Sequence, residues 1–514
     1  MARLLYFILL ITIGSPIAIQ AQANWSHPCG TPPGKSAWLK EYQRHPEAFA
    51  RDNDTTLYVP LTIHLVGSDS GAGFFAMSGL KAAFCKLNEG FLDANIQFFI
   101  AGEINYLANS AWYSHETVLE GAEMMFTNNV AGTLNIYFVN DPAGNCGYNL
   151  PYAGIAMRKS CSGPNDNTWA HEIGHALAIP HPFLGWEGGI SFDGSETHNY
   201  SNPAPETITY DYTFFQDTLI EDTLIIDTAY VELIDGSNCQ FAADGFCDTA
   251  PDYLAQRWFC SANGTSSTVQ TDPNGETFQS DGSLIMGYSD DGCQNRFTEE
   301  QIAAMRADLY EENPDWISEE EPLEFVASTV TTFLSPTEGA EVPFDEVLLA
   351  WEPVANASQY ILQISPLPTF GIRSEYVIDE TELVLTDLVA DRTYYWRITP
   401  FNDYHFCAPI SEVGTFTTTG VSNLPTVEGL TAFHIYPQPA KTGSEITADL
   451  TTQTSLNGNL RLYSSLGELL WDLPFDYSPG KHSVSIPTTR LAAGLYILAV
   501  QTPNGQTVRK LVVE

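Results

Sequence analysis

The sequence predicts an α+β domain followed by two β-sandwich domains, behind a segment that directs export. Three observations lead to this fold class. Residues 56–316 mix strand-like and helix-like runs around a histidine-rich helix, whereas residues 333–420 and 428–514 show only short alternating strands with turn residues between them. At 514 residues the chain is also too long for one domain, and length alone favours three or four.

Residues 1–23 have the features of a signal peptide. Arg3 supplies a positive charge, LLYFILLITIG an apolar stretch, and Ala21-Gln22-Ala23 a small-residue cleavage site. A transmembrane anchor is the alternative, but the apolar run is too short to span a bilayer and no other long one follows. We therefore expect the chain to leave the cytoplasm.

Residues 171–181, HEIGHALAIPH, contain three histidines and a glutamate spaced for a metal site. His171 and His175 are four residues apart, so both imidazoles project from the same face of an α-helix. His181 lies too far along for that face, so the chain must leave the helix and turn back to bring in a third nitrogen. Three neutral imidazoles and a water form an open tetrahedral zinc site of the catalytic kind. A buried helix with incidental histidines is the alternative.

A second element lies downstream in SLIMGYSDDGC, which contains Met286 and Tyr288, and the two elements together resemble the metzincin metallopeptidases. Within that clan the pappalysin-type family is most similar. Its blocks resemble HEIGHALAIPHPFLG, DGFCDTAP and MGYSDDGCQNRFTEEQIAAM, and its upstream strands and helix resemble YVPLTIHLVG, LNEGFLDANIQFFI and LNIYFVN. The resemblance covers roughly residues 55–310. It implies a twisted mixed sheet above the zinc-binding helix, with a less regular lower part that carries the methionine turn.

The resemblance also implies roles for single residues. The ligands of one zinc ion are expected to be His171, His175 and His181. Zinc lowers the pKa of its bound water, and Glu172 acts as the general base that takes the proton and passes it to the leaving amine. Met286 is expected to form a hydrophobic floor beneath the histidines, because a thioether binds zinc poorly. Tyr288 matches a position whose hydroxyl ligates zinc or supports the tetrahedral intermediate, and a packed core tyrosine is the alternative.

Two positions depart from the family pattern. The family usually has glycine where this chain has Ala178, and a left-handed alanine there costs about 1–2 kcal/mol. Members that cleave before basic residues carry an acidic residue immediately before the cysteine of the methionine turn. This chain has Gly292 there, after Asp290 and Asp291, so a preference for Arg or Lys is not predicted.

The segment around DGFCDTAP suggests two structural features. Relatives bind structural calcium in this block, which here offers Asp244, Asp248 and Thr249, and a tight polar turn is the alternative. Nine cysteines fit an oxidising compartment. Four of them cluster between this block and the methionine turn, and we expect disulfides among them without assigning the pairs: Cys239, Cys247, Cys260 and Cys293.

Residues 24–55 are interpreted as a pro-segment that contains the odd cysteine, Cys29. Because a thiolate is a strong zinc ligand, Cys29 could occupy the open position of the zinc ion until the segment is removed. Pairing of Cys29 with another cysteine is the alternative.

The strand patterns of the two C-terminal segments predict two β-sandwich domains. Residues 333–420 have the strand pattern of a fibronectin type III-like domain, with Trp351, Tyr360, Leu388 and Trp396 at core positions. Residues 428–514, with HIYPQPAKTG, LRLYSSLGELLW and LAAGLYILAVQT, resemble the C-terminal sorting domain of the bacterial type IX secretion system. That resemblance implies recognition by the secretion machinery, and then secretion or display on the outer cell surface.

The net charge of the chain limits the classes of molecule that it is expected to bind. A formal charge of −42 and a pI near 4.3 argue against nucleic acids and anionic membranes. The function predicted from the sequence is therefore a secreted zinc endopeptidase that acts on extracellular proteins or peptides. The alternative is a secreted or surface-displayed binding protein that keeps the metzincin fold without catalysis, although the glutamate of the helix motif argues against it.

Overall fold

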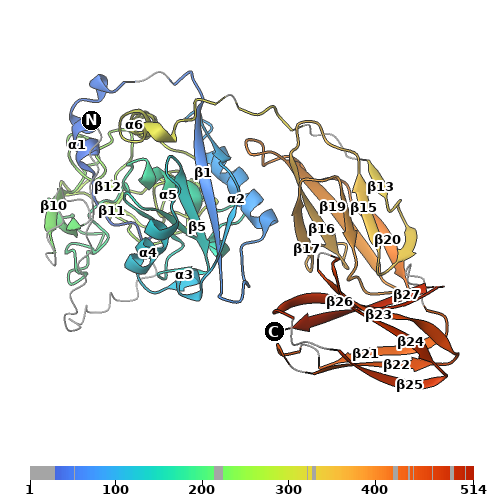
Figure 1. Ribbon diagram of the computed structural model, residues 1–514. Coiled ribbons are helices and arrows are strands. Elements are labelled where there is room, and N and C mark those ends of the chain that lie inside the picture. Colours follow the sequence, from blue (N-terminus) through green and yellow to red (C-terminus); the bar gives the residue numbers. More distant parts are fainter. Residues whose placement is uncertain are drawn as a thin grey trace, which may run out of the picture. The chain divides into compact units, whose positions relative to one another are not determined.

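The structure, a computed structural model, forms two compact units (Figure 1). It describes residues 29–513 apart from 51–52, 214–223, 321, 327–331, 421–426, 438–439, 444, 466, 487–490 and 504. Unit 1 comprises Met1–Val326 with Phe401–Ala408, and unit 2 comprises Ala327–Pro400 with Pro409–Glu514. The predicted signal peptide and the first residues of the predicted pro-segment lie outside the described residues.

A six-stranded mixed sheet forms the centre of unit 1. Its strands are β1 (Leu57–Gly67), β2 (Ile96–Ile100), β3 (Asn105–Ala108), β5 (Leu134–Val139), β7 (Gly147–Leu150) and β8 (Gly154–Arg158). The order is β2-β1-β5-β8-β7, and β3 also pairs with β1. All pairs are parallel except β7 with β8. The parallel strands β1 and β5 are buried along nearly their whole length, which explains their continuous apolar sequences.

Helices flank this sheet and supply the functional segment. They are α1 (Ala37–Arg44), α2 (Met77–Gly90), α3 (Ser110–Tyr113), α4 (Val118–Asn128), α5 (Thr168–Ala176) and α6 (Glu299–Glu311), with the 3₁₀ turns η1 (Pro46–Ala48), η2 (Lys159–Cys161) and η4 (Pro314–Trp316). Capping boxes start α4 and α6, each with a threonine at the N-cap and a glutamate or glutamine three residues later. Helix α5 packs against β7, β8 and α2, so it lies directly beside the sheet edge.

The remainder of unit 1 is less regular, as the sequence predicts. Its short strands are β4 (Ser114–His115), β6 (Asp141–Pro142), β9 (Thr207–Asp211), β10 (Ile226–Tyr230), β11 (Gln270–Thr271) and β12 (Thr277–Phe278). Disulfides join Cys239 to Cys247 and Cys260 to Cys293, which confirms the predicted cysteines and assigns their pairs. A further disulfide joins Cys146 to Cys161.

One part of unit 1 was not predicted from the sequence. Residues Phe401–Ala408 belong to it, although Phe401 is the last residue of a strand of the fibronectin type III-like segment. A disulfide joins Cys407 to Cys85 of α2, and the ring of Tyr404 stacks on Phe99 of β2 with centroids 4.2 Å apart. These residues therefore pack against α2 and against β2, the edge strand of the sheet in unit 1.

Unit 2 contains two β-sandwiches. The first pairs the sheet β13-β15-β18 with β14-β20-β19-β16-β17, and the second pairs β21-β22-β25 with β24-β23-β26-β27. The strands of the first are β13 (Phe333–Ser335), β14 (Ala340–Pro343), β15 (Val347–Trp351), β16 (Gln359–Ser365), β17 (Ser374–Ile378), β18 (Glu382–Leu385), β19 (Thr393–Phe401) and β20 (Gly414–Thr419). Those of the second are β21 (Leu430–Tyr436), β22 (Ile446–Thr452), β23 (Leu456–Ser464), β24 (Leu469–Tyr477), β25 (Gly480–Ile486), β26 (Gly494–Thr502) and β27 (Gly505–Val513).

The alternation of apolar and polar residues along the strands largely predicts which side chains form the cores of these sandwiches. Trp351, Tyr360 and Trp396 are buried in the first sandwich, as predicted. Leu388 is only half-buried, because β18 ends at Leu385 and leaves Leu388 in the loop that follows. In the second sandwich one hydrophobic cluster draws residues from both sheets.

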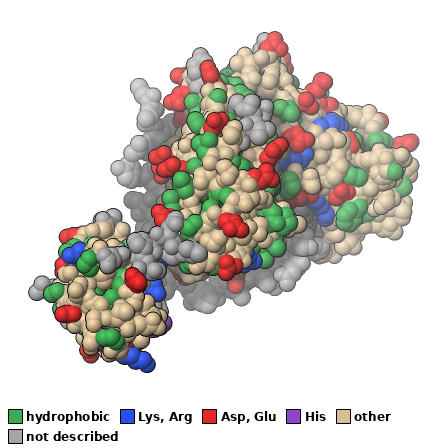
Figure 2. Space-filling model, turned by 90° about the vertical axis from the view of Figure 1, so that its right-hand side faces the viewer, with side chains coloured by type: hydrophobic (Ala, Val, Ile, Leu, Met, Phe, Trp, Pro, Cys, Tyr) green, Lys and Arg blue, Asp and Glu red, His purple; other side chains and the backbone are tan. Residues whose placement is uncertain are grey.

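The surface carries the acidic excess of the chain. Figure 2 shows Asp and Glu side chains spread over the visible face, with few Lys and Arg side chains among them. None of the described helices combines the length and the apolar character that crossing a bilayer requires.

Candidate metal centre

Helix α5 places two of the three histidines of the motif. His171 and His175 lie one turn apart on the helix, while Trp169 on its other side meets Phe138 of β5 edge to face, with centroids 5.0 Å apart. This packing fixes the rotation of the helix about its axis. Both imidazoles consequently point away from the sheet core and toward the segment that follows the helix.

The end of α5 brings in the third histidine. Ala178 has a φ of 67°, the left-handed conformation that its position predicts. The Ile179 N–H donates to the carbonyl of Gly174 at 2.9 Å, and the Ala178 N–H donates to the carbonyl of His175 at 3.1 Å. These two bonds are those of a Schellman motif, which reverses the chain direction. The reversal carries His181 back over the helix.

Replacing Ala178 with glycine is expected to raise the free energy of unfolding by about 1 kcal/mol, because glycine has no Cβ to oppose a left-handed backbone. The midpoint of thermal unfolding measures this change. The matched control is Ala176→Gly at the last helical residue, which should instead lower stability by about 0.5–1 kcal/mol. A lower midpoint for Ala178→Gly would contradict the assigned conformation.

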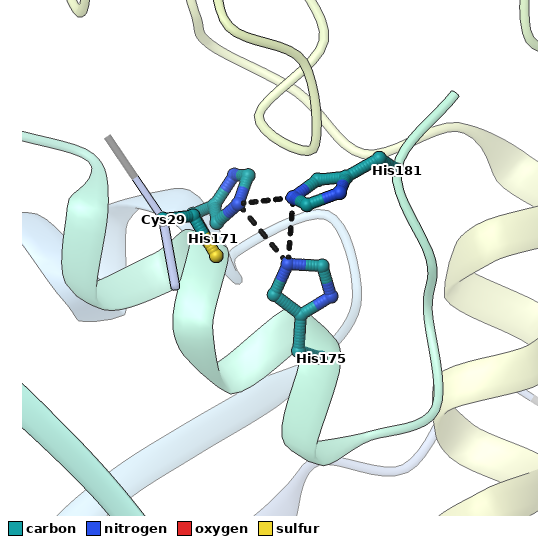
Figure 3. Close-up of side chains that lie close together, drawn as sticks. All are labelled: Cys29, His171, His175 and His181. Carbon is teal, nitrogen blue, oxygen red and sulfur yellow. Dashed lines mark hydrogen bonds between the residues drawn. The ribbon is translucent and has the colours of Figure 1, made fainter. Parts of the chain in front are cut away.

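The three imidazoles converge on one point (Figure 3). The Nε2 atoms of His171 and His181 are 3.2 Å apart, those of His171 and His175 are 3.1 Å apart, and those of His175 and His181 are 3.0 Å apart. Each Nδ1 faces an oxygen instead: the carbonyl of Ile285 at 2.8 Å for His171, that of Ile179 at 2.7 Å for His175, and the Glu187 carboxylate at 3.4 Å for His181.

This arrangement suits a zinc ion. A carbonyl oxygen only accepts, so the ring proton lies on Nδ1 and the Nε2 lone pairs face one another. Three such lone pairs repel unless a cation lies between them. Ligands of a tetrahedral zinc at about 2.0–2.1 Å stand roughly 3.3 Å from each other, close to the observed separations. Nδ1 bonds to carbonyls and carboxylates are also the usual orienting contacts of metal-binding histidines. Burial lowers the pKa of His171 to about 4, so the ring is neutral and able to bind a metal.

Glu172 lies beside this point and is fully buried. Its Oε2 accepts a hydrogen bond from the Thr31 hydroxyl at 2.9 Å, and its Oε1 has no partner among the described residues. Burial raises the pKa of Glu172 to about 8, while the bonds from Thr31 and Cys29 act in the opposite direction. A Cβ on Gly147 of β7 would stand only 2.9 Å from Cγ of Glu172, so the glycine makes room for this side chain.

Met286 and Tyr288 lie below and beside the histidines. A Cβ on Gly174 would approach the Met286 sulfur to 2.4 Å, so the methionine lies against the helix between its two histidines, in the position expected of a floor. The Tyr288 ring lies 4.9 Å from that of His181, and its hydroxyl donates to the carbonyl of Cys29 at 3.3 Å. Tyr288 is therefore engaged by the N-terminal segment.

Cys29 is a free, buried cysteine at the same centre. One ligand atom from each of Cys29, His171, His175 and His181 lies within 4.8 Å of the others. Pairing of Cys29 with another cysteine is excluded here, because the other eight cysteines form four disulfides. Burial, and then the carboxylate of Glu172, raise the pKa of the Cys29 thiol.

The segment after Cys29 runs along the edge of the sheet. Cys29 bridges to Gly147 in parallel orientation, the Gly30 N–H donates to the Gly147 carbonyl at 2.8 Å, and the Asn149 N–H donates to the Thr31 hydroxyl at 2.8 Å. A cleft of about 790 Å³ is lined both by this segment and by the histidine motif. The N-terminal segment therefore forms part of the wall of this cleft.

The predicted calcium residues are only partly brought together. The Thr249 hydroxyl donates to Oδ1 of Asp244 at 3.0 Å, but Asp248 is exposed and accepts from the Glu300 N–H at the start of α6. Oδ2 of Asp244 is buried without a hydrogen-bond partner among the described residues, and burial raises the pKa of this carboxyl to about 7. The buried ammonium of Lys35 interacts electrostatically with Asp244.

Sequence reasoning missed two polar contacts of the centre. Thr31 bonds to Glu172 across 141 positions of sequence, and no local pattern could reveal that. Glu187 lies six residues after His181, and a carboxylate so close to a ligand histidine was a readable signal for an orienting partner.

Comparisons with known proteins address the C-terminal part of the chain. The secretion system C-terminal sorting domain matches residues 434–514. The chain therefore carries a type IX sorting domain, which indicates a secreted or outer-surface bacterial protein and the secretion machinery as a partner. No curated protein matches the chain.

Several solved structures also match the chain. The FN1–FN3 domains of chicken CNTN1 are 14% identical over 35% of this chain and 67% of theirs, with a TM-score of 0.16. A fibronectin type III domain from the human KIAA0970 protein is 21% identical over 21% of this chain and 80% of its own, with a TM-score of 0.16. The fibronectin(III)-like modules of Clostridium thermocellum CbhA are 13% identical over 36% of this chain and 93% of theirs, with a TM-score of 0.15.

Proposed function

We propose that this protein is a secreted zinc-dependent endopeptidase that resembles the pappalysin-type metzincins. The observation that carries the proposal is the convergence of three Nε2 atoms within 3.0–3.2 Å of one another, each ring oriented by an oxygen at Nδ1. A buried carboxylate adjoins that point, and a cleft passes it. This combination supports hydrolysis rather than a purely structural metal site, because three protein ligands leave one position open.

Different residues of the chain have different roles in the proposed hydrolysis. His171, His175 and His181 would hold the ion, which supplies Lewis acidity that makes a water molecule reactive near neutral pH and polarises the carbonyl. Glu172 takes up the proton of the attacking water at its carboxylate and returns it to the leaving amine. The edge of β7, now engaged by residues 29–31, is the place where a substrate backbone would add as a further strand.

The unprocessed chain is proposed to be latent. The Cys29 sulfur lies within 4.8 Å of the three imidazole nitrogens, where it could take the fourth position around a metal ion, and the Thr31 hydroxyl donates to the carboxylate of Glu172. A bound cation would stabilise the thiolate, which offsets the burial that raises its pKa here. Removal of the segment before about residue 55 would release both groups together.

Calcium near Asp244 is a further proposal. Its support is the pair of buried carboxylate oxygens without hydrogen-bond partners, on Asp244 and Glu232, beside the ammonium of Lys35. Because Lys35 lies within the predicted pro-segment, removal of that segment would leave both carboxylates without a neighbouring cation.

A casein digest tests the proposed function. Full-length protein loaded with zinc and activated by limited proteolysis should cleave casein, a chelator should stop the cleavage, and added zinc should restore it, because the metal is required for turnover. Absence of cleavage by the activated, zinc-loaded protein would favour the non-catalytic binding protein instead.

A further inference from the structure

A small pocket adjoins the metal centre on the side of the methionine turn. Cys29 and His171 form one part of its wall, and Arg257 and Asp291 form another. Since Cys29 belongs to the predicted pro-segment, the pocket would open toward the cleft when that segment leaves. A side chain next to the cut bond would be the substrate group nearest to it.

The backbone holds Arg257 firmly at this pocket. The Trp258 N–H donates to the Tyr288 carbonyl at 3.1 Å, and Trp258 forms a parallel bridge with Ser289. Two residues farther on, Cys260 is joined to Cys293 by a disulfide. The strand-like segment with Arg257 is thus fastened along the loop with Asp291.

The hydrogen bonds of the two charged side chains are unequal. Each carboxylate oxygen of Asp291 already has a partner: its Oδ1 accepts from the Asn167 N–H at 2.8 Å, and its Oδ2 accepts from Nη2 of Arg257. That ion pair uses only one of the five N–H donors of the guanidinium. Among the described residues, no other acceptor takes a hydrogen bond from Arg257, and its side chain is 37% exposed. Four guanidinium donors thus remain unused against about two acceptor sites of Asp291, so the larger unused hydrogen-bonding capacity at the pocket is that of the cation.

The other residues that line the pocket also favour a negatively charged ligand. Thr168, the first residue of α5, also lines the pocket, so the positive end of the helix faces it. Gln294 adds a neutral amide. Gly292 has no side chain that could contribute a negative charge.

We propose that Arg257 determines substrate specificity, and that this pocket selects an acidic side chain directly next to the scissile bond. The inference rests on the proposed endopeptidase function and adds the class of substrate to it. A Glu or Asp carboxylate accepts from the unused guanidinium donors, whereas a Lys or Arg side chain would have to displace Arg257 from Asp291. Charge-assisted hydrogen bonds of this kind correspond to about 10–100-fold discrimination.

A peptide library digested by the activated, zinc-loaded full chain tests this specificity. The expected result is at least about tenfold faster cleavage next to Asp or Glu than next to Lys or Arg. Arg257→Gln should abolish or reverse that preference, because Asp291 is then left without its cation, and Arg257→Lys should keep part of it. The matched control is Arg296→Gln, which breaks a similar surface pair with Asp281 outside the pocket and should leave the preference unchanged.

Two outcomes would overturn the inference: equal or faster cleavage next to basic residues by the wild type, or a preference that Arg257→Gln leaves intact. A binding measurement separates this failure from failure of the proposed function. The catalytically disabled Glu172→Gln protein, activated in the same way, should bind a labelled acidic peptide at least about tenfold more tightly than its lysine counterpart. Such binding without any cleavage by the wild type would contradict the proposed endopeptidase function and still support the acidic specificity of the pocket.

Discussion

Glu172→Gln should lower kcat/KM for peptide hydrolysis by about 10²–10⁴-fold while zinc content and thermal stability stay near those of the wild type. Glutamine has the same shape, and in the unprocessed chain its amide oxygen still accepts from the Thr31 hydroxyl, so the buried site keeps its packing. It cannot take up a proton at the pH of the assay. The loss should therefore appear mainly in kcat, and activated, zinc-loaded protein with a fluorogenic peptide measures it.

A matched carboxylate separates the role of a base from that of a ligand support. Glu187 contacts Nδ1 of His181, the ring atom that faces away from the metal centre, so Glu187→Gln should weaken zinc binding by about 10–100-fold. Saturating zinc should restore turnover in Glu187→Gln and leave the loss of activity in Glu172→Gln unchanged. Residual activity of Glu172→Gln equal to that of the wild type would eliminate Glu172 as the base.

Cys29→Ser should make the unprocessed full chain active. If four ligands share a zinc binding free energy of about 10–16 kcal/mol, one thiolate accounts for roughly 3 kcal/mol. This free energy corresponds to about a 100-fold change in the fraction of protein whose zinc is open to substrate. The unprocessed wild type should therefore cleave a peptide about 100-fold more slowly than unprocessed Cys29→Ser. Both proteins should reach the same rate once the N-terminal segment has been removed.

The control for latency is Thr31→Val, which removes the hydroxyl contact to Glu172 and keeps the thiol. Its unprocessed form should gain about tenfold or less, since one hydrogen bond to a charged group is lost. Equal rates for unprocessed wild type and Cys29→Ser would show that the thiol does not close the site. The segment would then inhibit, if at all, by lying along β7.

The sequence predicted the parts of the fold and site whose causes are local. Spacing along one helix placed His171 and His175 together, and the distance to His181 required a reversal at Ala178. Alternation of apolar residues predicted both sandwiches, and the core tryptophans followed. The C-terminal sorting domain was found from its own sequence motifs.

The remaining features depend on contacts between distant segments. Nothing near Thr31 or Arg257 in sequence signals that the one meets Glu172 and the other meets Asp291. The same is true of Phe401–Ala408, whose place in unit 1 rests on a disulfide to α2 and on stacking of Tyr404. Pairings of this kind are set by the tertiary fold and have no periodicity of their own.

Zinc K-edge X-ray absorption on the purified, unprocessed protein can show whether the three histidines and Cys29 bind one zinc ion. We expect one zinc ion per chain with imidazole nitrogens at about 2.0–2.1 Å and one sulfur at about 2.3 Å. The sulfur contribution should disappear in Cys29→Ser while the nitrogen ligands remain. A protein without bound zinc, or a zinc ion without imidazole ligands, would contradict this expectation.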